Sequence, residues 1–299
     1  MKKCLLATLL GIILLASCKS KPNTISPESL PRLAVLPFIS GDAIEDDLEE
    51  TFAWQLANVP EIQKFYLIVP ITPQIRKNIK QEQTYNSAFE AGTEVYADFV
   101  MVTFVRSIGN QWFFYIMIMN VKTKELITGD CRKFDYLDEI SQCLASMVTK
   151  MMNVVSHKKQ NMPKLAVDVF KLPPINNLKP DTATALTQIL ASEMANNSMF
   201  SIFPRTDNID MASMAYEKEQ TSSKDAVVDT SYLTAAEYVL SCKISSLTSP
   251  PAPPFDMLGE ILLIDNNQLI AGSHISFDAI EDAPEYMAKL AKALSGSRR

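Results

Sequence analysis

The sequence predicts an α/β fold made of two tandem repeats, each a mixed sheet with helices. The first observation is that three short phrases return later in the chain in the same order: "RLAVLPF" (32–38) as "KLAVDVF" (164–170), "QEQT" (81–84) as "KEQT" (218–221), and "ADFVMV" (97–102) as "AEYVLS" (236–241). The second is that apolar residues around these phrases alternate between helical spacing and short β-prone runs. The separation of the copies drifts only between elements, where loops tolerate insertions, so we interpret the pattern as a duplicated domain.

In the first repeat, the run at 32–38 predicts a strand. A helix follows, because Leu48, Phe52, Leu56 and Val59 mark one face. The acidic residues at 45–50 suit the positively polarised start of that helix. The remaining elements expected in this repeat are a strand at 65–70, a polar helix that contains 79–84, three strands at about 97–106, 111–120 and 124–134, and a closing helix whose apolar face spans 140–155.

The second repeat is expected to follow the same order, β-α-β-α-β-β-β-α. Leu186, Leu190 and Met194 mark its first helix. Its other recognisable elements are strands at 200–204, 236–241 and 268–272 and a closing helix at about 282–294. We therefore expect two domains, at 32–155 and 164–295, each with its own core and joined by a linker at 156–163.

The first 17 residues predict a secretion signal. Two lysines precede an apolar stretch of eleven residues, whereas a helix that spans a bilayer needs about 20. The stretch ends in "LASC" (15–18), which resembles the bacterial lipobox. The resemblance implies cleavage before Cys18 and attachment of diacylglycerol to its thiol. The alternative is an ordinary signal peptide followed by an incidental cysteine.

Residues 18–31 are polar and contain proline, and we expect them to form a flexible tether with a root-mean-square reach of roughly 20 Å. Lys19 follows the cysteine, and the absence of aspartate at that position favours the outer membrane in the sorting rule of Gram-negative bacteria. Removal of the signal deletes two lysines and no acid, which changes the formal net charge from −6 to −8. An acidic protein is a poor candidate for binding nucleic acid or an anionic lipid surface.

The first repeat resembles a set of bacterial envelope domains. Its opening "LAVLPF", the strand "ADFVMV" and the closing "ITG" at 127–129 occur in an order of elements that is similar to the amino-terminal domain of TolB, the penicillin-binding-protein activator LpoB and the curli secretion lipoprotein CsgG. The resemblance covers the second repeat more loosely. It implies a protein that binds other envelope proteins and has no catalytic residues to transfer.

The sequence contains no recognisable motif for catalysis or metal binding. The chain has 8 glycines and 2 histidines and contains no Walker, dinucleotide or zinc-protease motif. His157 is expected to be solvated in the linker and His274 to lie on a strand. Cys131, Cys143 and Cys242 do not pair off and lack metal-ligand spacing. We predict no enzyme activity, cofactor or metal site.

Three segments keep alternative interpretations. The run "WFFYIMIM" (112–119) is favoured as a central strand covered on both faces, and the alternative is a strand exposed to a membrane. The methionine-bearing helix at 140–155 is favoured as packing on its own sheet, and the alternative is contact with lipid or a partner. The segment "SPPAPPF" (249–255) reads either as a stiff hairpin loop or as a docking element for a protein partner, with Pro250, Pro251, Pro253, Pro254 and Phe255 as its candidate contact residues.

The sequence therefore predicts a non-catalytic, lipid-anchored protein of the bacterial cell envelope, on the periplasmic side of the outer membrane. Its expected role is that of a tethered scaffold or accessory factor for another envelope protein. The alternative is a lipoprotein that interacts with lipid or inserts into the membrane.

Overall fold

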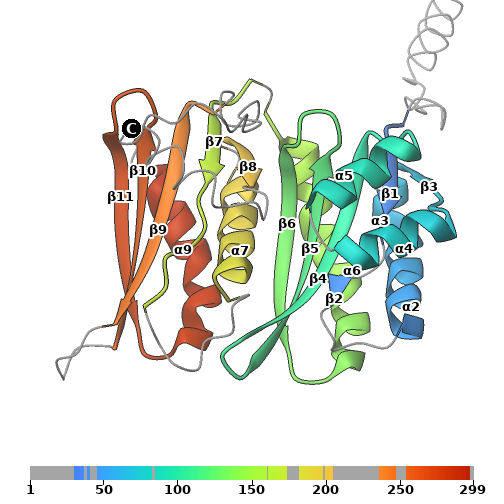
Figure 1. Ribbon diagram of the computed structural model, residues 1–299, viewed down its shortest axis with the longest axis horizontal. Coiled ribbons are helices and arrows are strands. Elements are labelled where there is room, and N and C mark those ends of the chain that lie inside the picture. Colours follow the sequence, from blue (N-terminus) through green and yellow to red (C-terminus); the bar gives the residue numbers. More distant parts are fainter. Residues whose placement is uncertain are drawn as a thin grey trace, which may run out of the picture. The chain divides into compact units, whose positions relative to one another are not determined.

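The computed structural model describes residues 30–36, 39–40, 46–82, 85–159, 161–173, 182–197, 199–204, 236–246 and 254–296. These residues confirm the predicted α/β class. Their strands form a mixed sheet of eleven strands, and helices pack against it (Figure 1).

The first half of the chain supplies six strands and five helices among the described residues. The helix that the sequence predicts around 79–84 is present as two helices, and two short elements were not predicted. The strands are β1 (Arg32–Val35), β2 (Ile39–Ser40), β3 (Leu67–Val69), β4 (Phe99–Ile108), β5 (Gln111–Asn120) and β6 (Leu126–Phe134), and the helices are α2 (Asp46–Ala57), α3 (Pro60–Gln63), α4 (Pro73–Glu82), α5 (Tyr85–Glu94) and α6 (Leu137–His157).

The second half contains fewer described helices. The phrase at 218–221, which the sequence comparison used, lies outside the described residues. The described elements are β7 (Lys164–Val167), α7 (Thr182–Asn196), β8 (Ser201–Pro204), β9 (Tyr238–Ser246), β10 (Phe255–Leu263), β11 (Gln268–Phe277), a 3₁₀ turn η3 (Ile280–Asp282) and α9 (Ala283–Gly296).

Strand pairing follows one pattern in both halves. The strand order is β11-β10-β9-β7-β8-β6-β5-β4-β1-β3, with β2 beside β4. The first strand of each half pairs in parallel with two later strands, β1 with β3 and β4, and β7 with β8 and β9. The last three strands of each half form an antiparallel meander. The duplication itself stays a prediction.

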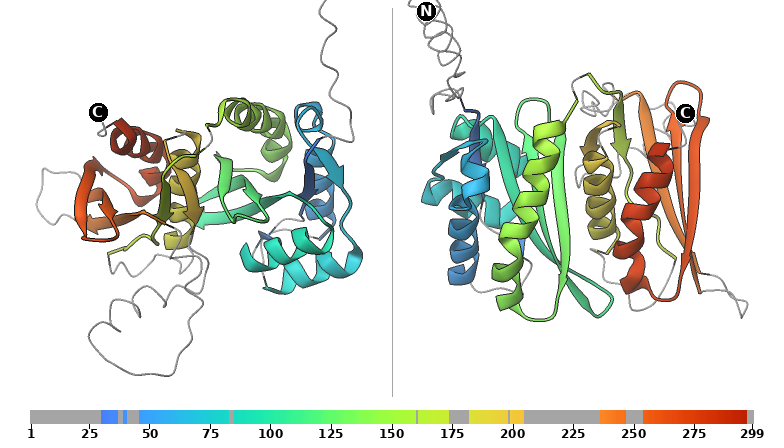
Figure 2. Two further views of the ribbon diagram at one scale, coloured as in Figure 1. Left: turned by 90° about the horizontal axis from the view of Figure 1, so that it is seen from above. Right: turned by 180° about the vertical axis from the view of Figure 1, so that it is seen from behind.

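The apolar run at 112–119 lies in β5, between β4 and β6, and its residues from Phe113 to Met119 are buried. Because helices cover both faces of the sheet here, the strand has no solvent side and needs no polar alternation. In Figure 2, α4 and α5 lie on the opposite side of the sheet from α6. The prediction of a central strand is confirmed.

The closing helix of the first half packs on the sheet as predicted. Residues spaced three or four apart, from Ile140 through Leu144, Met147 and Val148 to Met151, are buried against one sheet face. No helix formed by the described residues has the length and hydropathy needed to cross a bilayer.

Helix α7 is buried on nearly all sides. It packs on β8 and α9 of its own half and on β6 and β4 of the first half. Apolar residues of both halves, such as Met117 and Leu190, belong to one cluster. The two halves thus share part of a core around α7, and the predicted division into 32–155 and 164–295 as separate folding units stays a prediction.

Candidate functional site

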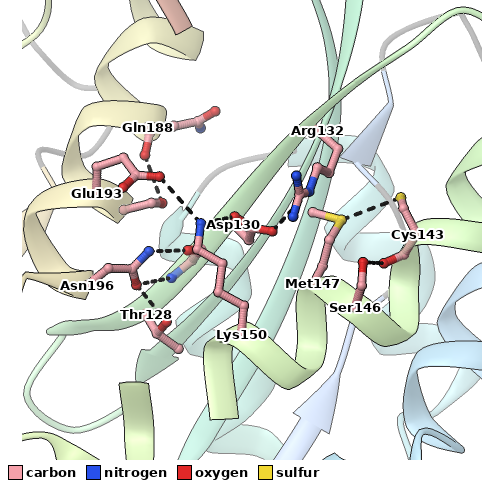
Figure 3. Close-up of polar contacts among 12 residues, drawn as sticks. Thr128, Asp130, Arg132, Cys143, Ser146, Met147, Lys150, Gln188, Glu193 and Asn196 are labelled. Carbon is pink, nitrogen blue, oxygen red and sulfur yellow. Dashed lines mark hydrogen bonds and ion pairs between the residues drawn. The ribbon is translucent and has the colours of Figure 1, made fainter. Parts of the chain in front are cut away.

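A buried carboxylate lies in the middle of β6. The side chain of Asp130 is 2% exposed, and its register opposite Ile116 directs it to the sheet face that α6 covers. Lys150 on α6 places its Nζ 2.5 Å from Asp130 Oδ1 (Figure 3). A charge in such a site requires a partner of opposite sign, because burial of an unpaired carboxylate is costly.

Arg132 and Glu193 are two further charged residues beside this pair. We define the polar junction as these two residues with Asp130 and Lys150, together with the neutral Asn196 described below. Arg132 Nε lies 3.4 Å from Asp130 Oδ2, and Glu193 Oε1 on α7 lies 3.7 Å from Lys150 Nζ. Lys150 therefore bridges a carboxylate of the first half and one of the second. Two carboxylates face two cations, so the cluster is formally neutral.

The environment shifts the proton affinities of the junction. Burial lowers the pKa of Lys150, but the hydrogen bond and charge of Asp130, with the charge of Glu193, outweigh it and leave that pKa raised. Burial raises the pKa of Glu193, and the charge of Lys150 opposes this without cancelling it. Both charged partners of Lys150 thus hold it in the protonated state.

Asn196 pairs with the open edge of β6. Its Nδ2 donates to the Gly129 carbonyl at 2.8 Å, and its Oδ1 accepts from the Gly129 N–H at 3.4 Å and from the Thr128 hydroxyl at 2.8 Å. The side-chain amide thereby occupies the donor and acceptor that a neighbouring strand would use. This matters because β6 pairs with β8 only at Leu126 and Ile202, and an unpaired edge attracts other chains.

Gly129 lets α7 approach this edge closely. A Cβ atom at position 129 would lie 2.3 Å from Ser192 Oγ and 3.0 Å from the Ile116 carbonyl oxygen. Only glycine fits between the helix and the strand without displacing one of them. The contact of α7 with β6 therefore depends on a missing side chain as well as on polar pairing.

Lys158 covers the start of the same edge. Its Nζ donates to the carbonyls of Leu126 at 3.2 Å and Ile127 at 3.0 Å and pairs with Glu125 at 3.1 Å. Burial lowers the pKa of Lys158, although Glu125 opposes the shift. The predicted linker at 156–163 is therefore fastened to β6 by its Lys158 side chain.

A surface hollow of about 580 Å³ opens beside the junction, between α6 and the end of α7. Its hydroxyl groups are engaged within α6: Ser146 donates to the Cys143 carbonyl and Thr149 to the Ala145 carbonyl. The remaining residues of the hollow are Lys150, Asn153, Val154, His157 and Asn196. Lys150 is already paired with two carboxylates, and most of the surface that lines the hollow is apolar.

The structure places only two of the predicted site residues. Cys18, Pro250, Pro251 and Pro253 lie outside the described residues. Pro254 is exposed, and Phe255 opens β10 with its ring stacked on Phe277 at 5.7 Å between centroids. Neither Pro254 nor Phe255 belongs to the polar junction.

The two histidines lie in different settings. His157 is exposed at the end of α6, and its Nδ1 is 2.8 Å from the Asn153 carbonyl oxygen. His274 is on β11, with Nδ1 3.4 Å from Asp256 Oδ1, and the Ser276 hydroxyl donates to that same carboxylate oxygen. The hydroxyl is therefore not hydrogen-bonded to the imidazole, as a serine nucleophile and its base would be.

The described residues include no group of His, Cys, Asp and Glu arranged to hold a metal ion. Their three cysteines are free thiols, and burial raises the pKa of the Cys131 and Cys242 thiols. A raised pKa keeps a thiol protonated and unreactive at neutral pH.

Sequence reasoning missed the polar junction. The available signal was Asp130, an aspartate in the middle of the predicted strand at 124–134, whose neighbours Gly129 and Thr128 are buried. Asn196 lies in "MAN" (194–196), which is similar to "LAN" (56–58). Its contact with β6 has no local sequence signature.

No protein-family model and no curated protein sequence matches the chain. Parts of it are similar to solved structures. PelC from Paraburkholderia phytofirmans, a dodecamer, is 15% identical over 45% of this chain and 88% of that chain, with a TM-score of 0.28. TolB from Acinetobacter baumannii is 12% identical over 46% and 30% of the two chains, with a TM-score of 0.26. The LpoB C-terminal domain from Salmonella enterica is 18% identical over 38% and 87%, with a TM-score of 0.28.

TolB and LpoB, which the sequence resemblance named, are thus among the similar structures. Each similarity covers less than half of this chain, and scores of this size assign neither a family nor a function. The resemblance to CsgG and the tandem arrangement stay predictions.

Proposed function

We propose that the protein is a non-catalytic, lipid-anchored scaffold or accessory factor for another protein of the bacterial cell envelope. The single observation that supports this best is the polar junction. By joining β6, α6 and α7, it makes one body of the two halves, and such a body suits presentation of a fixed surface to a partner. The sequence "LASC" (15–18) supplies the proposed anchor at Cys18.

The proposed location is the periplasmic side of the outer membrane, on the basis of Lys19 after the acylated cysteine. A doubly or triply acylated cysteine binds a bilayer stably, since each buried methylene contributes about 0.8 kcal/mol. The acidic mature chain, with a formal net charge of −8 derived from the sequence, argues against nucleic acid as a partner.

Membrane insertion is the alternative function, and the packing does not favour it. The segment at 112–119 would have to leave the centre of the sheet, where Phe114, Ile116 and Met117 are buried. The apolar face of α6 is likewise covered by its own sheet. Leakage of dye from liposomes distinguishes the two functions, and the scaffold function predicts none from the unlipidated protein.

The proposed docking element is the proline segment, with Pro250, Pro251, Pro253, Pro254 and Phe255. Because Phe255 stacks on Phe277, a deletion test should spare it. Removal of 250–254 is expected to weaken partner binding and to leave unfolding nearly unchanged.

The experiment is crosslinking in living cells, with photoreactive residues placed one at a time in the segment 249–254 and at exposed positions elsewhere on the surface, followed by identification of the crosslinked proteins. A reproducible protein adduct that is lost when Cys18 is changed to serine supports the proposed function. An acylated protein that crosslinks to no protein from any surface position contradicts it.

A further inference from the structure

The start of β3 and the loop after α5 both contact the start of β1, the first strand of the sheet. Pro31 precedes β1, and its carbonyl accepts from the Leu67 N–H at 2.9 Å. The Arg32 N–H donates to Asp98 Oδ2 at 2.8 Å, and the Arg32 guanidinium donates to the Val95 carbonyl at 3.0 Å. The start of β3 and the loop after α5 therefore lie beside the point where the chain arrives from the predicted tether.

This end of the sheet exposes apolar and basic side chains. Tyr96 is 80% exposed and Leu67 is 44% exposed. The turn after β5 joins the same end, because the Val121 N–H donates to the Asp98 carbonyl at 2.9 Å, and Lys122 in that turn is exposed. We call Arg32, Leu67, Tyr96 and Lys122 the entry rim.

The packing of the fold does not explain why a tyrosine side chain occupies position 96. Its φ is +54°, in the left-handed region that follows many helices and is usually occupied by glycine. A bulky side chain is strained there, and this one gains little from packing because it is exposed. Strain at an exposed aromatic residue is a reason to look for a function of that side chain.

The length of the chain before β1 limits how far the entry rim can lie from an anchor at Cys18. Twelve residues, 19–30, separate Cys18 from Pro31, and a chain of that length has a root-mean-square reach of roughly 20 Å. The opposite end of the sheet lies beyond the nine residues of β6, a span of about 30 Å. An anchor at Cys18 therefore holds the entry rim close to the bilayer and leaves Tyr136, which follows β6 and is 70% exposed, farther away.

We propose that the entry rim contacts the headgroup region of the bilayer to which the protein is anchored, with Tyr96 and Leu67 at the lipid interface. Tyrosine suits this position because its ring is apolar and its hydroxyl is polar. The Asp98 carboxylate accepts from the Arg32 N–H and offsets part of the basic charge of the rim, so we expect lipid charge to contribute little. The contact is too small to bind the free protein, and anchoring makes it effective by raising the local concentration of lipid. This inference rests on the proposed acylation of Cys18.

The test uses full-length acylated protein in vesicles of phosphatidylethanolamine and phosphatidylglycerol that contain a radiolabelled phospholipid. A photoreactive phenylalanine replaces Tyr96 in one sample and Tyr136 in the matched control. Both positions are exposed, and they lie at opposite ends of the sheet. Attachment of the acyl chain is measured separately by mass.

We expect position 96 to crosslink to phospholipid several-fold more than position 136. The signal at position 96 should disappear in the Cys18→Ser protein mixed with the same vesicles. Equal crosslinking at the two positions of an acylated protein overturns the inference alone. A protein without an acyl chain overturns the anchor, and with it both the inference and the proposed function.

Discussion

The Lys150 ammonium on α6 lies 2.5 Å from the Asp130 carboxylate on β6 and 3.7 Å from the Glu193 carboxylate on α7. One side chain of the first half thus pairs with an acid from each half. Because these contacts are partly buried, the strength of the junction is measurable as unfolding free energy.

Asp130→Asn should lower the free energy of unfolding by about 1–2 kcal/mol. Loss of one partner of a buried ion pair costs more than this, but the Lys150 and Arg132 side chains are 44% and 48% exposed and solvent screens them. Denaturant unfolding at neutral pH measures the change. Asp135→Asn, at an exposed position just after β6, is the control and should change little. Equal effects of the two substitutions would contradict a specific role for Asp130.

Glu193→Gln should flatten part of the pH dependence of stability. Burial raises the folded-state pKa of Glu193 above its ordinary value of 4.5, so the folded protein takes up this proton more readily than the unfolded chain. The stability contributed by the protonated form is therefore lost as the pH rises through the raised pKa. At pH 7 the Gln variant should be at least as stable as the parent.

Thermal unfolding of both proteins across the range from pH 4.5 to pH 7 tests this sign. A Glu193→Gln protein that is less stable than the parent at pH 7, by an amount that shrinks toward pH 4.5, would show that the ion pair with Lys150 outweighs burial and lowers the pKa of Glu193.

Asn196→Ala should lower the free energy of unfolding by about 1–3 kcal/mol, because it leaves the Gly129 N–H and carbonyl and the Thr128 hydroxyl without this partner. The neighbouring Asn197, just after α7, donates from its Nδ2 to the Glu193 carbonyl within the same helix end. Asn197→Ala is therefore the matched control, with an expected change within about 0.5 kcal/mol.

The same pair of variants tests the predicted division of the chain. Since α7 packs on both halves, we expect the parent protein to unfold in one transition and the Asn196→Ala protein to approach two. Proteolysis near 156–163 should then become faster in Asn196→Ala than in Asn197→Ala. Two separate transitions in the parent protein would show that the halves do not share a cooperative core.

Glycine at positions 96 and 136 tests whether the backbone at Tyr96 is strained. Tyr96 has a φ of +54°, so Tyr96→Gly relieves strain and should leave stability unchanged or raise it by up to about 1 kcal/mol. Tyr136 is extended, with a φ of −129°, at the N-cap of α6, where glycine is well accepted, so Tyr136→Gly relieves no strain and should change stability by no more than about 0.5 kcal/mol. Chemical unfolding measures both, and a larger loss at position 96 than at position 136 would mean that Tyr96 stabilises the fold.

Much of the fold is local and was predictable. Helical spacing from Ile140 to Met151 places α6, and the apolar run in β5 places the central strand. The splitting of the polar helix into α4 and α5 was not predicted, because α4 is mostly polar and has only Ile75 and Ile79 as buried apolar residues to mark its face.

The junction was not predictable, because it depends on where distant segments meet. Asn58 and Asn196 occupy matching positions in "LAN" and "MAN", yet Asn58 Nδ2 donates to the Trp54 carbonyl of its own helix and Asn196 Nδ2 donates to Gly129, 67 residues away. The difference arises because α7 lies against the edge of β6. Neither half of the chain taken alone contains that information.

Metabolic labelling of living cells with a tagged fatty acid, in cells that produce either the parent protein or Cys18→Ser, tests the central claim most directly. We predict that the parent protein carries the label and fractionates with membranes, whereas the Cys18→Ser protein carries none. The Cys18→Ser protein should unfold at the same denaturant concentration as the parent protein. Label retained by the Cys18→Ser protein would contradict the account of a scaffold anchored through Cys18.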